Sequence, residues 1–538
     1  MNKNYKLKIY NWILFMLFFF LQTSCTKGDN VTGSNGEENR KKEVFTKVYN
    51  TNLSYYSKTL GKLVTYSAIL PKEYLTDDSK NFGVVFLFHG WGGSSNDWGP
   101  NEIYIQSTAE SMVAKGQVRP LIYIIPDCEN TYFCNKYDGK RPVMDMIVKE
   151  LVPQIDKQFR TTAKAEERCV MGYSMGGFGA LSTAMQHQDV FKTCVALSPS
   201  MNTDEQYVDL SQEGWNVQWG DNFGGSGTKG ISRLTDYYLS QCPLHFMKDK
   251  PISSFNQVRY YIDCGDDEER LYQGSAELHN ILRERGIYHE YRVRNGAHTT
   301  SYWRSSLDDM LQFIESSFNN KDFVPSGTLS FDSSQDHVVK INDNFEGVSL
   351  NIYKPKGAVV DNSYKFLYSS IGEGKSSLDD DKFVEALDSL MEKKKLVIVT
   401  FNPLSAKNAS KDLDQIEQYV EKSLSVTVDK NSRFAFAYGK EAGIIYRQTV
   451  KDNATVSNLF SLDADWGNDV SASSSVSYYL FMGDDGTNYK SMAELFVKCR
   501  AAESNVQYRV YNGEDATISV QNGIHMMCSF LVQYLNNI

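Results

Sequence analysis

Short apolar runs alternate with amphipathic stretches along the first half of the chain. Residues 83–88 and 121–126 are almost wholly apolar, which is typical of strands that a parallel sheet buries on both faces. Residues 63–71 alternate between apolar and polar positions and end at a proline, as expected for a half-buried strand. Residues 144–159 carry apolar side chains at helical spacing. This alternation of strands and helices predicts an α/β fold.

One predicted strand-to-helix junction carries the clearest chemical signal. The apolar run 169–171 leads into the sequence GYSMGG at residues 172–177, and a run of small residues typical of a tightly packed helix follows. The pattern G-x-S-x-G places a serine on a sharp turn at the edge of a sheet, and the glycines leave room for the neighbouring backbone. We therefore expect Ser174 to be a nucleophile, with the start of the helix beneath a developing oxyanion.

The partners that an activated serine needs follow Ser174 in the order acid, then histidine. A predicted strand at residues 258–265 leads into four consecutive carboxylates at residues 266–269, and His298 lies in a glycine-bounded loop after the last predicted strand of this half. His298 is the expected base. His279 falls on a predicted helix and His289 on or beside a predicted strand, where surface or packing roles are expected. Any of the four carboxylates could orient the imidazole.

A second glycine-rich turn, HGWGG at residues 89–93, follows the apolar strand 83–88. In hydrolases with a G-x-S-x-G turn, the loop at this place supplies one oxyanion N–H and the residue after the nucleophile supplies the other. The pattern predicts an oxyanion hole made by the backbone amides of Trp91 and Met175.

These motifs together resemble the esterase-D-like family of α/β hydrolases, which includes feruloyl and acetylxylan esterases of carbohydrate esterase family one, S-formylglutathione hydrolases and enterochelin esterases. The resemblance covers residues 48–318. It implies an α/β-hydrolase fold, no cofactor or metal, Ser174 as nucleophile and His298 as base. It places the acid three residues after the strand-end glycine, at Glu268, where the family usually has aspartate. Counting back from the following helix gives Glu269 and the nearest aspartate is Asp267, so Asp267 and Glu268 are both kept as candidates.

The first residues have the pattern of a targeting signal. Lysines at positions 3, 6 and 8 precede the apolar run 12–21, which is too short to span a bilayer, and Cys25 follows. This pattern resembles a bacterial lipoprotein signal, with residues 1–24 removed and Cys25 lipidated. It predicts an exported protein anchored to a membrane at the periplasmic face or cell surface, followed by a polar tether at residues 25–45. A plain secretory signal and an uncleaved anchor are the alternatives.

The second half repeats elements of the first. Residues 478–485 resemble 260–267, residues 493–495 resemble 276–278, and residues 508–513 resemble 291–296. The last two pairs share one offset of 217 positions. An internal duplication explains the repeat. The fold class predicted is an α/β-hydrolase domain (residues 46–318), a linker (319–330), and a second, smaller degenerate α/β-hydrolase-like domain (331–538).

The catalytic residues do not recur in this second copy. The counterpart of Ser174 is Glu441 when the glycines are matched and Gly439 when the preceding strand is matched. Asp515 stands in the place of His298, and residues 368–372 replace the glycine-rich loop. We therefore expect residues 331–538 to be noncatalytic, with carbohydrate binding, packing against the first domain or stability alone as possible roles.

Composition narrows the partners. The net charge of −10 and the lack of a long basic run argue against nucleic acid as a partner.

Residues 201–248 interrupt the alternation of strands and helices. We expect them to form either a lid or substrate wall, or a passive insertion. Cys128 and Cys134 are the expected disulfide pair of an exported protein, while Cys169, Cys194 and Cys264 suit buried thiols.

These features predict an exported serine carboxylesterase that hydrolyses feruloyl or acetyl esters of a polysaccharide or oligosaccharide through an acyl-enzyme. Two alternatives remain at this stage. One is another ester hydrolase of the same family, acting on siderophore or simple lipid esters. The other is a noncatalytic glycan-binding protein at the cell surface. The sequence gives no prediction of oligomeric state.

Overall fold

The computed structural model describes residues 45–268, 270–323, 338–371, 380–401, 413–439, 455–467 and 471–511, with a few positions between 523 and 531. The predicted signal, Cys25 and nearly all of the predicted tether lie outside these ranges, as do Glu269, Glu441 and Asp515. Among the helices of the described ranges, none has both the length and the apolar character needed to cross a membrane.

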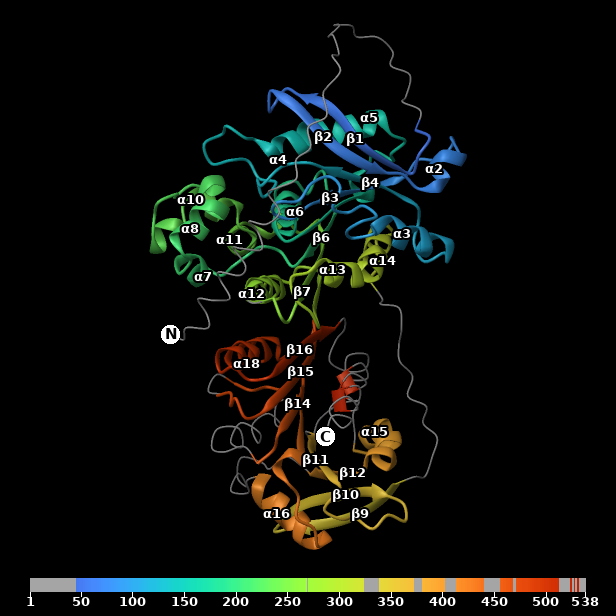
Figure 1. Ribbon diagram of the computed structural model, residues 1–538, viewed down its shortest axis with the longest axis vertical. Coiled ribbons are helices and arrows are strands. Elements are labelled where there is room, and N and C mark those ends of the chain that lie inside the picture. Colours follow the sequence, from blue (N-terminus) through green and yellow to red (C-terminus); the bar gives the residue numbers. More distant parts are fainter. Residues whose placement is uncertain are drawn as a thin grey trace. The chain divides into compact units, whose positions relative to one another are not determined.

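A mixed β-sheet forms the centre of the first half (Figure 1). Its strands are β1 (Tyr49–Ser57), β2 (Lys62–Ile69), β3 (Gly83–Phe88), β4 (Leu121–Pro126), β5 (Arg168–Tyr173), β6 (Thr193–Leu197), β7 (Arg259–Gly265) and β8 (His289–Arg294). They lie in the order β1-β2-β4-β3-β5-β6-β7-β8. Strand β2 is antiparallel to both of its neighbours, and β3 to β8 run parallel. This half of the chain has the α/β-hydrolase fold, as the motifs predict.

Strands β3 to β6 are buried along their whole length because helices cover both faces of this sheet. The helices are α2 (Lys72–Thr76), α3 (Ile105–Ala114), α4 (Val143–Met146), α5 (Val152–Gln158), α6 (Met175–Gln186), α7 (Asp204–Val208), α8 (Gln212–Gly214), α9 (Asp221–Phe223), α10 (Asp236–Gln241), α11 (Pro243–Asp249), α12 (Leu271–Glu284), α13 (Thr300–Ser305) and α14 (Leu307–Phe318). In β3, Val84 and Phe86 pack into the core shared with α5, α6 and α12. Val85 and Leu87 face the opposite core, formed with α3 and α14.

The second half continues the same sheet. Its strands are β9 (Val338–Phe345), β10 (Val348–Pro355), β11 (Lys365–Ile371), β12 (Leu396–Phe401), β13 (Arg433–Tyr438), β14 (Asn458–Leu462), β15 (Ser477–Gly483) and β16 (Val506–Tyr511). Its longer helices are α15 (Asp380–Lys394), α16 (Leu413–Leu424) and α18 (Tyr489–Ala501). From β9 to β16 the strand order matches that from β1 to β8, position by position. The two halves of the sheet join where β8 and β16 pair antiparallel, with Val293 opposite Val510.

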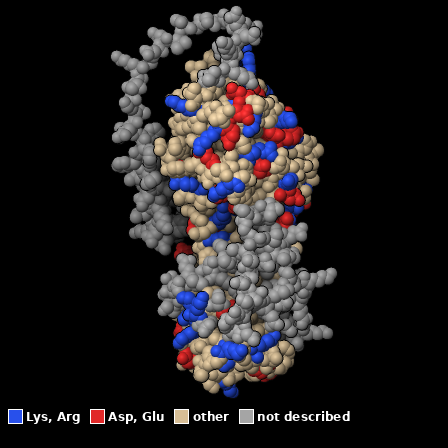
Figure 2. Space-filling model, turned by 90° about the vertical axis from the view of Figure 1, so that its right-hand side faces the viewer, with Lys and Arg blue, Asp and Glu red and all other residues tan. Residues whose placement is uncertain are grey.

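Charged side chains are mixed on the surface. On the face drawn in Figure 2, lysine and arginine lie among aspartate and glutamate over the described residues. The net charge of −10 is therefore not gathered into one acidic region of that face.

The fold brings the predicted chemistry to one edge of the first sheet. Parallel strands present their carboxyl ends on the same side, where α/β proteins place their sites. The segments that leave these ends carry Trp91 after β3, Ser174 after β5, Ser198 after β6, Glu268 after β7 and His298 after β8.

Candidate active site

Ser174 occupies a strained turn between β5 and α6. Its backbone has φ 54° and ψ −121°, which a residue with a side chain seldom adopts. The turn is possible because its neighbours are glycines: a Cβ on Gly172 would lie 2.2 Å from the Gly176 carbonyl oxygen, and one on Gly176 would lie 2.4 Å from the Phe88 carbonyl oxygen. The G-x-S-x-G pattern is thus explained by close backbone contact within the turn and against the end of β3.

His298 lies between Ser174 and a carboxylate. Its Nε2 is 2.9 Å from the Ser174 hydroxyl oxygen, and its Nδ1 is 2.8 Å from a Glu268 carboxylate oxygen. Because an ionised carboxylate can only accept, Nδ1 carries the proton and Nε2 is left to accept from the serine hydroxyl. This is the arrangement in which an imidazole can remove the serine proton.

Glu268 is fully buried and its other carboxylate oxygen is held by two donors. The Gly265 amide donates to that oxygen over 2.9 Å, and the Ser198 hydroxyl donates to it as well. The Trp303 indole donates in turn to the Ser198 hydroxyl oxygen over 2.9 Å. These bonds leave the second oxygen of Glu268 directed at His298. Neither Ser198 nor Trp303 stands in a sequence motif, so no pattern predicted a role for them.

Asp267, the other acid kept from the sequence, does not contact His298. Its carboxylate is 3.3 Å from the Arg500 guanidinium in the second half, and its side chain is 44% exposed. The turn after β7 directs consecutive side chains to opposite sides, so Glu268 points inward and Asp267 outward. Of the two acids kept from the sequence, Glu268, three residues after Gly265, is therefore the one that reaches the imidazole in this structure.

His279 and His289 contact each other, as their predicted packing roles suggest. The Nδ1 of His279 is 2.8 Å from the Nε2 of His289, and the His279 ring stacks on Tyr291. Burial lowers the pKa of His279 well below its ordinary value, so this ring is neutral in the folded protein.

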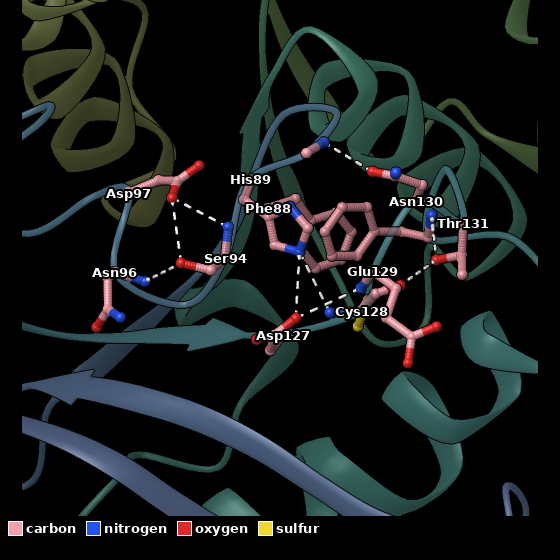
Figure 3. A network of polar contacts seen from close by, with 12 residues as sticks. Phe88, His89, Ser94, Asn96, Asp97, Asp127, Cys128, Glu129, Asn130 and Thr131 are labelled. Atoms are coloured by element: carbon pink, nitrogen blue, oxygen red, sulfur yellow. Dashed lines mark hydrogen bonds and ion pairs between the residues drawn. The ribbon is translucent and has the colours of Figure 1, made fainter. Parts of the chain in front are cut away.

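The loop after β3 is tied down on both sides of Trp91 (Figure 3). His89 is buried and accepts a hydrogen bond from the Cys128 amide at Nε2 over 3.2 Å, so its Nδ1 donates to the Gly90 carbonyl over 2.8 Å. Beyond Trp91, the Gly92 amide donates to the Asn130 side chain over 2.7 Å. The Met175 amide stands in the first turn of α6, where helix amides have no partner within the helix. Both predicted oxyanion donors thus belong to anchored backbone, at elements in contact with each other.

Tyr173 joins the nucleophile turn to the same loop. Its hydroxyl donates to Asp97 over 2.6 Å, and its ring packs 4.2 Å from Trp303, centroid to centroid. Burial and the neighbouring Asp97 hold the pKa of Tyr173 well above its ordinary value, so the hydroxyl stays a donor. The Ser94 amide donates to the same carboxylate over 3.0 Å.

Comparison with known proteins covers this part of the chain. Residues 57–314 match the family model described as putative esterase. An acetyl esterase of Caldicellulosiruptor saccharolyticus is 23% identical over 269 residues, which are 49% of this chain and 96% of that protein. An endo-1,4-beta-xylanase/feruloyl esterase of Xylanibacter ruminicola is 26% identical over 270 residues, 49% of this chain and 31% of that protein. The solved structure of a ferulic acid esterase aligns with a TM-score of 0.43 and 23% identity, covering 50% of this chain and 98% of that one.

Residues 57–314 are thus similar to the putative esterase family. The protein is a serine carboxylic ester hydrolase, and the part of the chain from β1 to α14 is called the esterase domain below.

The insertion at residues 201–248 is packed into the esterase domain. Tyr207 on α7, Phe223 on α9 and Tyr238 on α10 are buried aromatic side chains of this insertion, and the π-helical segment Trp215–Gly220 adds Trp215 and Trp219. The Trp219 ring lies 6.0 Å from Tyr132, whose hydroxyl is 3.3 Å from the Ser200 hydroxyl. The Ser200 amide donates to the Ser174 carbonyl over 2.8 Å. The insertion is thus built into the wall beside the nucleophile.

The expected disulfide between Cys128 and Cys134 is not formed. Both are free thiols, as are the other cysteines in the described ranges. The two side chains have separate surroundings: Cys128 follows the bond from its amide to His89, whereas Cys134 lies beside Ser182 and Cys242. Burial raises the pKa of Cys134 to about 12, which keeps the thiol protonated. The described residues also contain no cluster of three or more side chains suited to a metal ion.

Proposed function

We propose that the protein is an exported esterase that removes feruloyl or acetyl groups from polysaccharides or oligosaccharides. The observation that carries the hydrolytic part is the chain of hydrogen bonds from Ser174 through His298 to Glu268. The names of two relatives, an acetyl esterase and a xylanase/feruloyl esterase, support acylated carbohydrate as the substrate class.

In the acylation step, the Ser174 oxygen attacks the ester carbonyl carbon while His298 Nε2 takes the hydroxyl proton. The carbonyl oxygen becomes an oxyanion, which the amides of Trp91 and Met175 stabilise by donating hydrogen bonds. The carbon–oxygen bond to the alcohol then breaks, and the imidazolium returns its proton to the leaving sugar hydroxyl. Glu268 stabilises the imidazolium without taking its proton.

In the deacylation step, a water molecule takes the place of the alcohol. His298 removes one proton from the water as its oxygen attacks the acyl carbon, and the same two amides hold the second oxyanion. The bond to the Ser174 oxygen breaks, the serine regains its proton from the imidazolium, and the free acid leaves. Apart from this water molecule, neither step needs a further reactant, and neither step is an oxidation or a reduction.

The aromatic side chains beside the nucleophile support an aromatic acyl group. The rings of Trp91 and Tyr132 are 6.0 Å apart, and the ring of Trp219 is 6.0 Å from that of Tyr132. Tyr132 and Trp219 are buried, so the partly exposed Trp91 is the ring of the three that a substrate can reach. Offset or edge contacts with such a ring favour a planar aromatic acid over a short chain. We therefore place a feruloyl group before an acetyl group in the expected order of substrates.

Export and anchoring at Cys25 form a further part of the proposal. The lysines, the apolar run and Cys25 at the start of the sequence support it. Cells that express the full chain should carry the protein in the membrane fraction and incorporate labelled fatty acid into it. The Cys25→Ser variant should lose the label, and a label that persists in this variant would contradict lipidation at Cys25.

For the second half, we propose a duplicated and noncatalytic copy of the esterase domain. The matching strand order supports the duplication. Two positions support the loss of chemistry. Gly439 follows β13 with φ 70°, as Ser174 follows β5 with φ 54°. Gly486 donates its amide to the Gly483 carbonyl, as Glu268 does to Gly265. Neither glycine offers a nucleophile or an acid.

A panel of esters tests the substrate class. The full chain and its Ser174→Ala variant are compared on feruloylated and acetylated xylo-oligosaccharides, a siderophore-type triester and a short-chain triacylglycerol. We expect the highest kcat/KM on the feruloylated oligosaccharide and loss of all hydrolysis in Ser174→Ala. Faster hydrolysis of the triester or the triacylglycerol would contradict the carbohydrate substrate. Equal hydrolysis by Ser174→Ala would contradict the nucleophile.

A further inference from the structure

The junction between the esterase domain and the second half contains three kinds of contact that each occur twice. They surround the antiparallel pair Val293 and Val510. The matched contacts are Arg292 with Asp484 and Arg509 with Asp266, the Tyr291 amide with Asp484 and the Tyr508 amide with Asp266, and Arg283 with Asp485 and Arg500 with Asp267. The junction therefore has a local two-fold relation between equivalent residues, like the interface of a symmetric dimer.

One of these pairs lies directly behind the candidate active site. Asp266 is fully buried, and one of its carboxylate oxygens accepts from the Arg509 guanidinium over 2.6 Å and from the Tyr508 amide over 3.1 Å. Its other oxygen accepts from the Gly296 amide over 3.2 Å. Asp266 is two residues before Glu268, and Gly296 is two residues before His298. A single carboxylate thus connects the loop of the acid, the loop of the base and the second half.

The two loops are packed closely where this carboxylate joins them. The Asp266 amide donates to the Arg294 carbonyl over 3.0 Å, and the Asp267 amide donates to the Gly296 carbonyl over 2.9 Å. A Cβ on Gly265 would lie 2.1 Å from the same Gly296 carbonyl oxygen. A shift of either loop therefore moves the other, and with it the contact between Glu268 and His298.

Arg509 supplies the positive charge that makes this buried carboxylate tolerable. It is 2% exposed and lies on β16, in the second half. A buried carboxylate that loses its cationic partner must protonate, admit water or move, since an unpaired buried charge is strongly unfavourable. Each of these responses changes the hydrogen bonds that Asp266 makes to the two loops.

We propose that Arg509 is a positioning residue for ester hydrolysis, acting through Asp266 to fix the separation of the loops that carry Glu268 and His298. The second half is then part of the support of the active site, although it supplies no reacting group. This inference rests on the proposed roles of Ser174, His298 and Glu268.

The mirror pair provides a matched control. Asp484 receives Arg292 and the Tyr291 amide as Asp266 receives Arg509 and the Tyr508 amide, and it is nearly as buried. Its loop continues to Gly486 and carries no candidate catalytic residue. Asp266→Asn and Asp484→Asn therefore remove the same kind of ion pair from the same junction, and only the first touches the two catalytic loops.

The experiment measures kcat, KM and the unfolding temperature of the full chain and its variants on a soluble aryl ester. We expect Asp266→Asn and Arg509→Gln to lower kcat by about 10- to 100-fold with little change in KM, because a small misplacement of a catalytic pair is costly. Arg509→Lys should restore most of the rate. Asp484→Asn should lower the unfolding temperature as Asp266→Asn does, and keep the wild-type kcat. Equal losses of kcat in both Asp→Asn variants, or none in Arg509→Gln, would overturn the inference.

A second readout does not depend on turnover. Hydrogen exchange at residues 265–268 and 294–298 should be faster in Arg509→Gln than in the wild type and unchanged in Asp484→Asn. Unchanged exchange in Arg509→Gln overturns the positioning role even if the protein proves inactive on esters. Failure of the wild type on every ester would instead contradict the proposed function and leave this exchange result to decide the inference.

Discussion

Glu268 owes its position opposite His298 to the donors around its carboxylate. The Gly265 amide and the Ser198 hydroxyl hold one oxygen, so the other is presented to the imidazole. Its neighbour Asp267 has no such donors and instead pairs with Arg500 near the surface. The difference between two adjacent acids is therefore one of surroundings, and it can be measured by removing each charge in turn.

Glu268→Gln should lower kcat by about 10³-fold or more, because an amide at this position no longer stabilises the imidazolium or fixes its tautomer. Asp267→Asn is the matched control one residue away, and it should change kcat by less than about twofold, since an exposed ion pair contributes little. Steady-state kinetics on an aryl ester gives both values. A larger loss in Asp267→Asn than in Glu268→Gln would show that the acid has been assigned to the wrong residue.

Ser198 should affect the rate without touching substrate. Ser198→Ala removes one donor from the Glu268 carboxylate, and we expect kcat to fall by about tenfold, which corresponds to the loss of one charge-assisted hydrogen bond in the transition state. Ser182→Ala serves as the control, because this buried serine donates to the Gln241 carbonyl, away from Glu268. If both variants keep the wild-type kcat in the same assay, the bond from Ser198 has no role in holding the acid.

At this scale the motifs predicted that Ser174 and His298 would meet, but they did not predict the residues that support them. Ser174 and His298 stand in motifs whose spacing follows from strand ends, so their meeting can be expected from the order of elements alone. Which of four consecutive carboxylates turns inward depends on the path of one short turn, which the residue types do not determine. Ser198 and Trp303 stand in no sequence motif. Their role in holding the Glu268 carboxylate follows only from the residues that surround them in the folded protein.

Among the elements, α16 combines a helical apolar stripe with two buried glutamates. Glu417 lies among apolar neighbours and accepts from the Thr455 hydroxyl over 3.1 Å, while Arg433 is 4.0 Å away and pairs more closely with Glu421. Burial raises the pKa of Glu417 from 4.5 to about 7, and Arg433 offsets this effect only in part. The helix therefore carries a carboxyl group that is protonated in the folded chain at mildly acidic pH.

This group should make stability fall as the pH rises. Between pH 4.5 and about 7 the unfolded chain has released the Glu417 proton while the folded chain retains it, so raising the pH favours the unfolded state. Glu417→Gln, which mimics the protonated form, should gain about 1–3 kcal/mol relative to the wild type between pH 5 and pH 8. Urea unfolding at the two pH values measures this difference. The same difference at both would mean that Glu417 does not titrate in this range.

The strands could be predicted from the sequence. Apolar runs such as residues 83–88 and 121–126 coincide with β3 and β4, because strands covered on both faces leave no polar position. The insertion after β6 was harder. Its composition breaks the periodic pattern, and the structure resolves it into short helices whose aromatic side chains pack as a cluster around Tyr207 and Tyr238. Such packing depends on contacts among residues far apart in the sequence, so no local sequence pattern predicts it.

At the scale of the whole molecule, the main feature is the junction of β8 and β16, where the two halves of the chain pair with each other. Strand β8 would be an exposed edge of the esterase sheet, and pairing with β16 covers it. The repeat with an offset of 217 positions predicts that β8 and β16 are equivalent elements, and the strand order agrees with it. The repeat could not predict that the two would pair with each other, because equivalence along a chain does not fix which edges meet. For the same reason, the repeat could not predict the buried ion pairs that Asp266 and Asp484 form across the junction.

The account depends above all on Ser174 acting as the nucleophile that carries the acyl group. The most direct measurement is mass spectrometry of the full chain, quenched with acid within milliseconds of mixing with a feruloyl ester and then digested. We predict a mass increase of one feruloyl group on the peptide that contains Ser174, and no such increase in the Ser174→Ala variant. Turnover of the ester with the adduct on another residue, or with no adduct while Ser174→Ala remains active, would contradict the account.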